Sequence, residues 1–331
     1  MTGNMIPEYQ VKQLYSDFGQ RKAMGVSSDD VRRPHFFLHR TFLGENDLLI
    51  ILNTKRCAYQ CFFCQLPAKS STKFIGTDDI LAQFLYVLNE LKHSLSVIER
   101  VTLSNEGSVL DSNTLPTDAL FIIAKCVHEL RRVHTWVLET RLEFINPEVI
   151  HELRTSTPRA SINILTGFET LDANIRDNIL FKRESIQSFE KGLDIVSRLK
   201  LDLTCYILYK PSQTMSDHDA FIEASASVDY LFEQTRKRNV QLSIRLNPMY
   251  AAQDSHWTDI AKQTPCYSPP KLTDILKLAE SKRHLEIPIY IGLSTEGLDN
   301  GNNYSVREEY SHDVVKQIML FNNSQRKVIY S

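Results

Sequence analysis

The chain has 331 residues, 42% of them hydrophobic, and its formal net charge is −2 at pH 7. This balance argues against a generally basic protein that coats nucleic acid. No apolar run approaches the ~20 residues that span a bilayer. The first residues, MTGNMIPEYQ, lack the charged segment and apolar core of a secretory signal. We therefore expect a cytoplasmic protein with no membrane partner.

Short apolar runs alternate with amphipathic segments along most of the chain. We expect buried strands at residues 47–53, 101–104, 135–140, 160–168, 203–209, 241–247 and 287–293. Helices are expected to fill the intervals between them. Thr77 is the predicted cap of the first helix, Pro116 begins the second, and Asn146 caps the third ahead of Pro147. The fourth helix covers about 171–199, the fifth ends near residue 237, and the sixth begins after Pro270.

Strands that alternate with helices in this way are parallel and are joined by crossover helices. Right-handed crossovers that all turn in one direction curl the sheet into a full or partial (β/α) barrel with parallel strands and outer helices. An open doubly wound sheet is the competing architecture. We assign the barrel to residues 46–298, an N-terminal extension that packs on it to residues 1–45, and a C-terminal extension to residues 299–331.

Three of the six cysteines lie within eight positions of the chain. Cys57, Cys61 and Cys64, spaced C-x3-C-x2-C, follow the first expected strand and so fall on the carboxyl rim, where barrel active sites are built. In a reducing compartment, clustered cysteines are metal ligands or redox thiols rather than a disulfide framework. Three thiolates can hold three corners of a [4Fe–4S] cluster, which leaves one iron with an open coordination position.

The other cysteines and the histidines leave alternatives open. Cys126 and Cys205 fall in apolar elements and are expected to be small buried hydrophobes, whereas Cys266 falls in a loop. A structural zinc site would need a fourth cysteine or histidine nearby, and the nearest histidines are His39 and His93. A ferredoxin-like electron carrier would need a fourth cysteine, and a reactive thiol or a disulfide is a third alternative.

The C-x3-C-x2-C spacing, with the aromatic Phe63 before the third cysteine, resembles the hallmark of the radical S-adenosylmethionine (SAM) superfamily. The resemblance implies a [4Fe–4S] cluster on Cys57, Cys61 and Cys64, with SAM bound to the open iron through its amino and carboxylate groups. It also implies an electron donor such as flavodoxin or ferredoxin, and reductive cleavage of a carbon–sulfur bond of SAM. The chemistry then belongs to the cofactors, and the protein supplies positioning and electrostatics.

Further motifs resemble those that frame SAM in this superfamily. Asn105, Glu106 and Gly107 follow the second expected strand, at the place of the motif that contacts the SAM amino group; a carboxylate suits an ammonium, and glycine allows close backbone approach. Glu139 and Arg141 resemble part of the Glu-[Ser/Thr]-Arg-Pro stretch of the Elongator catalytic subunit and the archaeosine-forming enzymes, with leucine in place of the proline. The alternatives are a simple turn for the first motif and a surface ion pair for the second.

The later strands carry less specific matches. Glu169 matches a residue that lies near the SAM ribose in these relatives, and Lys182, with Arg183 as the alternative, matches the basic residue that meets the SAM carboxylate. Asn247, in a Leu-Asn-Pro stretch that resembles the archaeosine group, and Tyr250 are candidates for the substrate pocket. An irregular loop is expected over residues 249–270, and long loops on a barrel rim are usually functional; a packing lid is the alternative.

The resemblance implies an enzyme that acts on a small or medium biosynthetic substrate. It either abstracts hydrogen through a 5′-deoxyadenosyl radical or transfers a 3-amino-3-carboxypropyl group. The Arg56-Cys57 motif also resembles that of enzymes of arsinothricin assembly, which transfer this group to arsenic. One alternative is a tRNA-base-modifying enzyme like the archaeosine group, and another is a non-catalytic iron–sulfur protein. The short basic runs at 131–132, 236–238 and 282–283 lie near expected helix ends, where cations are favoured anyway, so a small-molecule substrate is favoured over tRNA.

Overall fold

The computed structural model of the chain describes residues 22–25, 30–64, 70–105, 107–249, 255–293 and 312–325. Within them, nine strands form one sheet in chain order. β1, β2 and β3 are antiparallel neighbours, and every pair from β3 to β9 is parallel. The strands are β1 (Lys22–Gly25), β2 (Phe36–Phe42), β3 (Glu45–Leu52), β4 (Arg100–Asn105), β5 (Thr135–Glu139), β6 (Ser161–Glu169), β7 (Asp202–Tyr209), β8 (Leu242–Pro248) and β9 (Ile289–Ile291).

Helices connect the parallel strands. The α-helices are α3 (Thr77–Glu90), α4 (Thr117–Glu129), α5 (Pro147–Ser156), α6 (Ile186–Arg198), α7 (Asp217–Lys237), α8 (His256–Gln263), α9 (Leu272–Ser281) and α10 (His312–Ser324). Short 3₁₀ helices cover Leu95–Val97, Leu142–Phe144 and Arg283–Leu285, and a π-helix covers Ile175–Ile179. None of the helices described combines the length and the apolar composition of a membrane span.

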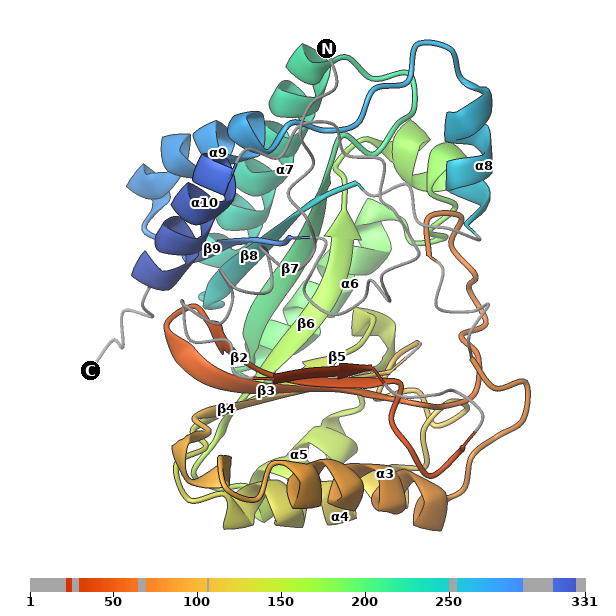
Figure 1. Cartoon of the computed structure of the whole chain (residues 1–331), viewed down its shortest axis with the longest axis vertical. Coiled ribbons are helices and arrows are strands. Elements are labelled where there is room, and N and C mark those ends of the chain that lie inside the picture. Colours follow the sequence, from red (N-terminus) through yellow and green to blue (C-terminus); the bar gives the residue numbers. More distant parts are fainter. Residues whose placement is uncertain are drawn as a thin grey trace.

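The sheet bends into a partial barrel with the helices outside it. In Figure 1, β2 to β5 run across the molecule and β6 to β9 rise from them, while α3, α4 and α5 lie below the first group and α7, α9 and α10 lie beside the second. In the described part of the chain, the first and last strands are not hydrogen-bonded to each other. The predicted parallel barrel with outer helices is therefore confirmed in its partial form, and the doubly wound alternative is wrong.

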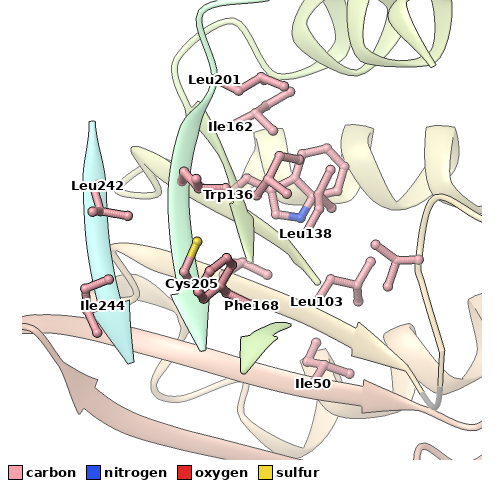
Figure 2. Packing of buried hydrophobic residues seen from close by; sticks show 14 of the residues in the cluster. Ile50, Leu103, Trp136, Leu138, Ile162, Phe168, Leu201, Cys205, Leu242 and Ile244 are labelled. Atoms are coloured by element: carbon pink, nitrogen blue, oxygen red, sulfur yellow. The ribbon is translucent and has the colours of Figure 1, made fainter. Parts of the chain in front are cut away.

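Alternation along each strand gives the sheet an apolar outer face. Figure 2 shows Ile50 of β3, Leu103 of β4 and Trp136 of β5 in this layer, where all three side chains are fully buried. A parallel sheet that is covered by helices needs such a face on every strand. Cys205 lies in the same layer, close to Phe168 in Figure 2, which confirms that this cysteine is a small buried hydrophobe.

β2 belongs to the sheet although it lies in the range predicted as an extension. It pairs with β3 over all seven of its residues. Leu43 and Gly44 join the two strands in a two-residue turn with positive φ at both positions, 51° and 81°. This is the backbone geometry of a type I′ turn, which matches the twist of a hairpin. The domain boundary at residue 45 remains a prediction.

Two predicted segments differ in the structure. The single helix predicted over 171–199 is a π-helix, then an extended stretch, then α6. Phe181 and Arg183 in the extended stretch have φ values of 52° and 55°, which no α-helix accommodates. The irregular loop predicted over 249–270 contains α8, whose N-cap Ser255 accepts a hydrogen bond from the Thr258 N–H group.

Of two predicted helix caps, one is confirmed and the other is wrong by one residue. Asn146 caps α5, because its side chain accepts from the Glu148 N–H group, as predicted. The cap predicted for α3 is wrong by one residue, since Gly76 is the N-cap and Thr77 is already the first helical residue. No side chain caps this end, so its N–H groups depend on other acceptors.

A buried ion network forms the floor of the barrel, at the amino ends of β3 and β4. Asp47 accepts hydrogen bonds from Arg40 Nε at 2.9 Å and from Thr102 Oγ1 at 2.7 Å. Arg100 approaches Glu45 to 3.2 Å and Asp47 to 3.9 Å, measured from nitrogen to oxygen. The side chains of Arg40, Asp47 and Arg100 are at most 2% exposed. Removing one of these charges leaves the others uncompensated in a medium of low dielectric.

Side chains of β2 and β9 meet near the same floor. The ring of Phe42, at the end of β2, lies 4.3 Å from that of Tyr290 in β9, centroid to centroid. The Arg245 guanidinium of β8 lies 5.6 Å from the Tyr290 ring and 5.8 Å from the Phe42 ring. α10 packs against both β2 and β9. We call this contact between β2 and β9, which packs through side chains, the β2–β9 seam.

Replacement of Asp47 by asparagine tests the floor. We expect Asp47→Asn to lower the free energy of unfolding by about 3–5 kcal/mol, because Arg40 and Arg100 lose a buried counter-charge. Urea denaturation measures the difference. Asp194→Asn is the matched control, because Asp194 pairs with Arg238 at 2.7 Å but is 65% exposed, and we expect a change within about 1 kcal/mol. Equal losses in the two variants would contradict a structural role for the buried network.

Candidate active site at the carboxyl rim

The cysteine loop follows β3, and other rim segments hold it in place. The Phe62 N–H group donates to the carbonyl of Leu180 at 2.9 Å, and the carbonyl of Phe62 accepts from Trp257 N–H at 3.0 Å. The ring of Phe62 stacks on that of Phe181, with 4.6 Å between centroids. The loop is therefore fixed between the stretch after the π-helix and the start of α8.

Cys57, Cys61 and Cys64 all lie on this loop. Cys61 and Cys64 share a tight turn, in which the Cys64 N–H group donates to the Cys61 carbonyl at 3.0 Å. All three side chains are half-buried. Within the described ranges, no three His, Cys, Asp or Glu side chains converge on a point where a single metal ion could be held. Three cysteine thiols on one loop are the type of donor that a [4Fe–4S] cluster would take, one thiolate on each of three irons.

Gly107 lies directly against the cysteine loop. A Cβ atom at this position would lie 3.3 Å from Cys57 Cβ and 3.6 Å from Thr114 Cγ2. Asn105 shapes the turn, because its Oδ1 accepts from the Gly107 N–H group at 3.0 Å and its Nδ2 donates to Thr114 Oγ1 at 3.3 Å. Glu106, predicted to meet the SAM amino group, lies outside the described residues.

Lys182 is a buried cation between two buried carboxylates. Its Nζ lies 3.6 Å from Glu169 Oε1 and 3.5 Å from Glu184 Oε2. Burial alone would lower the pKa of Lys182, but Glu184 and Glu169 outweigh it and raise that pKa above its ordinary value. Burial raises the pKa of Glu169 despite the opposing effect of Lys182. The predicted residues Glu169 and Lys182 are thus brought together.

The backbone around this ion group adopts sparsely populated conformations. β6 carries a register shift between Gly167 and Glu169, and Glu169 itself has φ of 68°. A Cβ on Gly167 would lie 2.0 Å from Glu169 Oε1 and 2.9 Å from Lys182 Nζ. Glycine at position 167 therefore makes the space in which the carboxylate and the ammonium lie. Such conformations persist where the surroundings fix them, and they cluster at functional sites.

Arg141 connects the cysteine loop to the Lys182 segment. Its Nη1 donates to the Lys182 carbonyl at 3.0 Å, and its Nη2 donates to the Arg183 carbonyl at 3.1 Å. Its Nε donates to Glu143 Oε1 at 2.8 Å. The guanidinium lies 3.8 Å from the centroid of the Tyr59 ring, which belongs to the cysteine loop. Arg141 therefore binds two backbone carbonyls as well as Glu143. The alternative interpretation, a surface ion pair, does not describe these contacts.

These groups set the electrostatic surroundings of Cys61. Burial raises the pKa of the Cys61 thiol, and the cations of Lys182 and Arg141 oppose this increase. Glu169 and Cys57 are the neighbouring acidic groups that act in the other direction. Two cations beside a cysteine loop favour bound thiolates and, with them, an anionic cluster.

Glu139 lies on the inner face of the barrel, away from Arg141. It is half-buried and is hydrogen-bonded to the side chain of Ser104. Burial raises the pKa of Glu139, and the cations of Arg245 and Arg40 act against this. The two residues of the predicted Glu-Thr-Arg stretch point to different environments, because β5 ends at Glu139 whereas Arg141 is the N-cap of the 3₁₀ helix Leu142–Phe144.

The predicted substrate residue Asn247 also lies on the inner face. Its Oδ1 accepts from Arg245 Nε at 3.4 Å, and a Cβ on Gly292 would lie 2.0 Å from that oxygen. Tyr250 lies outside the described residues. Phe63 packs against an apolar cluster beside the rim, which consists of Ile175, Leu180, Leu208, Met249, Trp257 and Ala261.

Three further rim residues escaped the sequence reasoning. Tyr59 donates a hydrogen bond from its hydroxyl to Glu143, and burial and this bond raise its pKa to about 12. Glu184 lies two residues after Lys182. Lys210 follows β7 directly, and its buried Nζ donates to Asp217 Oδ1 at 2.5 Å and to Ser268 Oγ at 2.8 Å. The position of Lys210 directly after an expected strand could have indicated that it lies at the carboxyl rim.

Replacement of Arg141 by lysine tests how the rim is held. Lysine keeps the charge but cannot reproduce three bonds in fixed directions. We expect Arg141→Lys to lower the free energy of unfolding by about 2–3 kcal/mol and to speed amide exchange around residues 181–184. Arg238→Lys is the control, because Arg238 donates to Asp194 and Gln234 near the molecular surface. Unchanged exchange at 181–184 in Arg141→Lys would contradict this role.

No family model matches the sequence. Among curated proteins, an uncharacterised protein of Methanocaldococcus jannaschii is 24% identical over 202 residues, which cover 59% of this chain and 55% of the relative. Archaeosine synthase subunit beta of Thermococcus kodakarensis is 26% identical over 192 residues, 55% of this chain and 57% of the relative. The chain thus spans little more than half the length of the curated relatives it matches.

Among solved structures, methylornithine synthase is similar over 96% of this chain and 93% of that one. Its TM-score is 0.52 and its sequence identity is 13%. At this identity the likeness concerns the fold. The cysteine loop stands at the carboxyl rim of that fold, where the sequence places it. The likeness confirms the predicted partial barrel with outer helices as the fold of this chain.

Proposed function

We propose that this chain is a radical SAM enzyme that holds a [4Fe–4S] cluster on Cys57, Cys61 and Cys64 and binds SAM beside it. The observation that carries the proposal is one loop that presents three thiols at the rim of a partial barrel, linked through Arg141 to the segment of the Lys182–Glu169 ion pair. When bound, the cluster and SAM supply a carbon-centred radical through one-electron cleavage of a carbon–sulfur bond. The residues of the chain bind, orient and shield the two cofactors.

The rim residues suit the parts of SAM by their charge. We assign Lys182 to the SAM carboxylate, because an ammonium binds a carboxylate. We assign Glu169 to the ribose, because a carboxylate accepts hydrogen bonds from hydroxyl groups. Gly107 lets the backbone after β4 approach the cysteine loop, so that Glu106 can accept from the SAM amino group. Arg141 then acts through Lys182, whose carbonyl it holds.

Asn105 and Phe63 support this arrangement from either side. Asn105 fixes the turn that carries Gly107, and Phe63 anchors the cysteine loop in the apolar cluster at the rim. Glu184 supplies a second buried carboxylate to Lys182. Because of Glu184, the Lys182 ammonium keeps a counter-charge when Glu169 forms hydrogen bonds with a ligand.

The substrate that we propose is a small or medium biosynthetic molecule, in a cytoplasmic enzyme that receives electrons from a donor such as flavodoxin or ferredoxin. Its conversion uses either hydrogen abstraction or transfer of a 3-amino-3-carboxypropyl group. Anaerobic reduction of the reconstituted protein with SAM, followed by mass analysis, tests the proposal. 5′-Deoxyadenosine supports the first route, 5′-methylthioadenosine supports the second, and intact SAM contradicts both.

A second candidate function is the modification of a tRNA base. The observation that favours it is the 26% identity to archaeosine synthase subunit beta of Thermococcus kodakarensis over 192 residues. Binding to tRNA would weaken steeply with salt, because each phosphate contact releases counterions. Absence of tRNA binding at low salt would remove this candidate.

Cysteine replacements test the cluster assignment. We expect Cys57→Ser, Cys61→Ser and Cys64→Ser each to lose most of the bound iron and the broad visible absorbance after anaerobic reconstitution, because one corner of the cluster loses its thiolate. Cys266→Ser is the control, since Cys266 is exposed and lies outside the loop; it should keep both signals. Retention of the full iron content in a Cys61→Ser protein would contradict the assignment.

Gly167→Ala tests the SAM site without disturbing the cluster ligands. The new Cβ would displace the ends of the Glu169 and Lys182 side chains, which are flexible, so we expect the fold to persist. We expect the dissociation constant for SAM to rise by about tenfold or more, equivalent to about 1.4 kcal/mol. Equilibrium binding of SAM to the reconstituted protein measures it.

Two glycines provide controls for Gly167→Ala. Gly76→Ala adds a methyl group with nothing within 4 Å, and it should leave SAM affinity unchanged. Gly192→Ala places Cβ 2.4 Å from Leu142 Cβ, at the root of that side chain, so it should destabilise the fold itself. Unaltered SAM affinity in a folded Gly167→Ala protein would remove Glu169 and Lys182 from the site.

A further inference from the structure

Glu169 lies at the centre of a tight turn at the carboxyl end of β6. The Thr170 N–H group donates to the Phe168 carbonyl at 3.0 Å, which closes a three-residue turn around Glu169. Because the φ value of Glu169 is 68°, this is the γ-turn of positive φ, which is rare and strained. A residue other than glycine keeps such a conformation only where its surroundings hold it. The direction of the Glu169 side chain therefore depends on how the next residue is held.

Thr170 is fully buried, and each of its polar groups forms a hydrogen bond. Its hydroxyl donates to Glu223 Oε1 at 2.5 Å and accepts from the Asp172 N–H group at 3.2 Å. Its carbonyl accepts from Nη2 of Arg176, in the π-helix. The peptide plane between Glu169 and Thr170 thus cannot rotate without breaking a buried hydrogen bond, which is costly.

Glu223 connects this turn to α7, on the outside of the barrel. Its Oε1 also accepts from the Leu171 N–H group at 2.9 Å and from Ser227 Oγ at 2.7 Å. Ser227, one helical turn further along α7, accepts from the same Leu171 N–H group at 2.8 Å. α7 itself packs against β7 and β8. Two side chains of a packed helix therefore bind the two residues that follow Glu169, and one of these side chains is a carboxylate, which forms the stronger kind of hydrogen bond.

We propose that Glu223 is a positioning residue for SAM: by binding Thr170 and Leu171, it maintains the strained turn that directs the Glu169 carboxylate to the SAM ribose. The inference rests on the proposed function, because it uses the assignment of Glu169 to the ribose. Glu223 acts through Glu169 and needs no contact with SAM. A group that is already held in its binding position loses little freedom when the ligand arrives, so release of the turn lowers affinity for the part of SAM that Glu169 binds.

Two fragments of SAM distinguish this role from a general loss of structure. 5′-Methylthioadenosine carries the ribose without the amino and carboxylate groups, and methionine carries those two groups without the ribose. The carboxylate end is assigned to Lys182, whose carbonyl Arg141 binds, and the ribose to Glu169. Damage to the whole rim would weaken the binding of both fragments, whereas a change confined to the Glu169 turn weakens the binding of 5′-methylthioadenosine alone.

Calorimetric titration of the reconstituted protein with SAM and with each fragment tests the inference. We expect Glu223→Ala to raise the dissociation constants of SAM and of 5′-methylthioadenosine by about tenfold, which corresponds to about 1.4 kcal/mol, and to leave that of methionine unchanged. Glu223→Gln keeps an acceptor oxygen and should recover most of the affinity. Arg141→Lys should give the opposite pattern, with the larger loss for methionine. Without any ligand, the Leu171 amide should exchange faster in Glu223→Ala than in the parent.

A double-mutant comparison shows whether Glu223 acts through Glu169. Glu169→Gln alone should weaken the binding of 5′-methylthioadenosine, and Glu223→Ala should add little to that loss, because both changes remove the same contact. Thr170→Val removes the hydroxyl that Glu223 binds and should reproduce the effect of Glu223→Ala, whereas Thr170→Ser should bind as the parent does. Glu233→Ala is the control, because Glu233 lies on α7 but is 60% exposed, and it should bind all three ligands as the parent does.

Three results would overturn the inference. One is a Glu223→Ala protein that binds SAM and both fragments as the parent does, which leaves the proposed function intact. Another is equal weakening of the two fragments, or additivity of Glu223→Ala and Glu169→Gln, which would assign Glu223 to the stability of the fold alone. The third is unchanged exchange of the Leu171 amide. Failure of the parent to bind SAM would instead contradict the proposed function and, with it, the ribose assignment that the inference uses.

Discussion

A lysine held between two carboxylates inside the protein is the constraint on which the rim of this molecule depends. Lys182 lies 3.6 Å from Glu169 and 3.5 Å from Glu184, and all three side chains are buried. Charges removed from water destabilise a fold unless their positions are well fixed. The local backbone meets that requirement through Gly167, which leaves space for two of the charged ends, and through Arg141, which binds the carbonyl of Lys182 itself.

The rest of the rim follows from this arrangement. Because Arg141 stacks on Tyr59, the cation that fixes the lysine segment also contacts the cysteine loop. Phe62 joins that loop to Leu180 on the other side of the lysine. Contacts therefore link the cysteine loop to the Lys182 segment, although more than a hundred residues separate them in the sequence. Preorganisation of this kind suits a site that must position a large cofactor.

The repeating part of the fold could be predicted from the sequence, because each inner strand of a parallel sheet is an uninterrupted apolar run. All seven predicted strands correspond to β3 to β9. β2 was missed because Arg40 breaks its apolar pattern, and only the structure shows that Asp47 neutralises this arginine within the sheet. α8 was missed because it is short, with eight residues, and polar residues dominate the stretch around it.

The cysteines were accessible to sequence reasoning because their spacing is local, and Lys182 and Glu169 because a family motif marks them. The roles of Glu139 and Arg141 were not accessible in the same way. The two residues are separated by one position, but Glu139 turns to the inner face while Arg141 turns to the rim. Glu184 could not be foreseen either, since its importance comes from a contact with Lys182 that depends on the positive φ of Arg183 between them.

The β2–β9 seam gives this barrel a freedom that a closed barrel lacks. In a closed barrel, the number of strands and their stagger fix the radius. Here β2 and β9 meet through the rings of Phe42 and Tyr290 and through α10, which packs on both strands. The separation of β2 and β9 is consequently set by the volume of a few side chains. Substitution at the seam can therefore change the curvature of the sheet there, while every hydrogen-bonded register in the sheet stays the same.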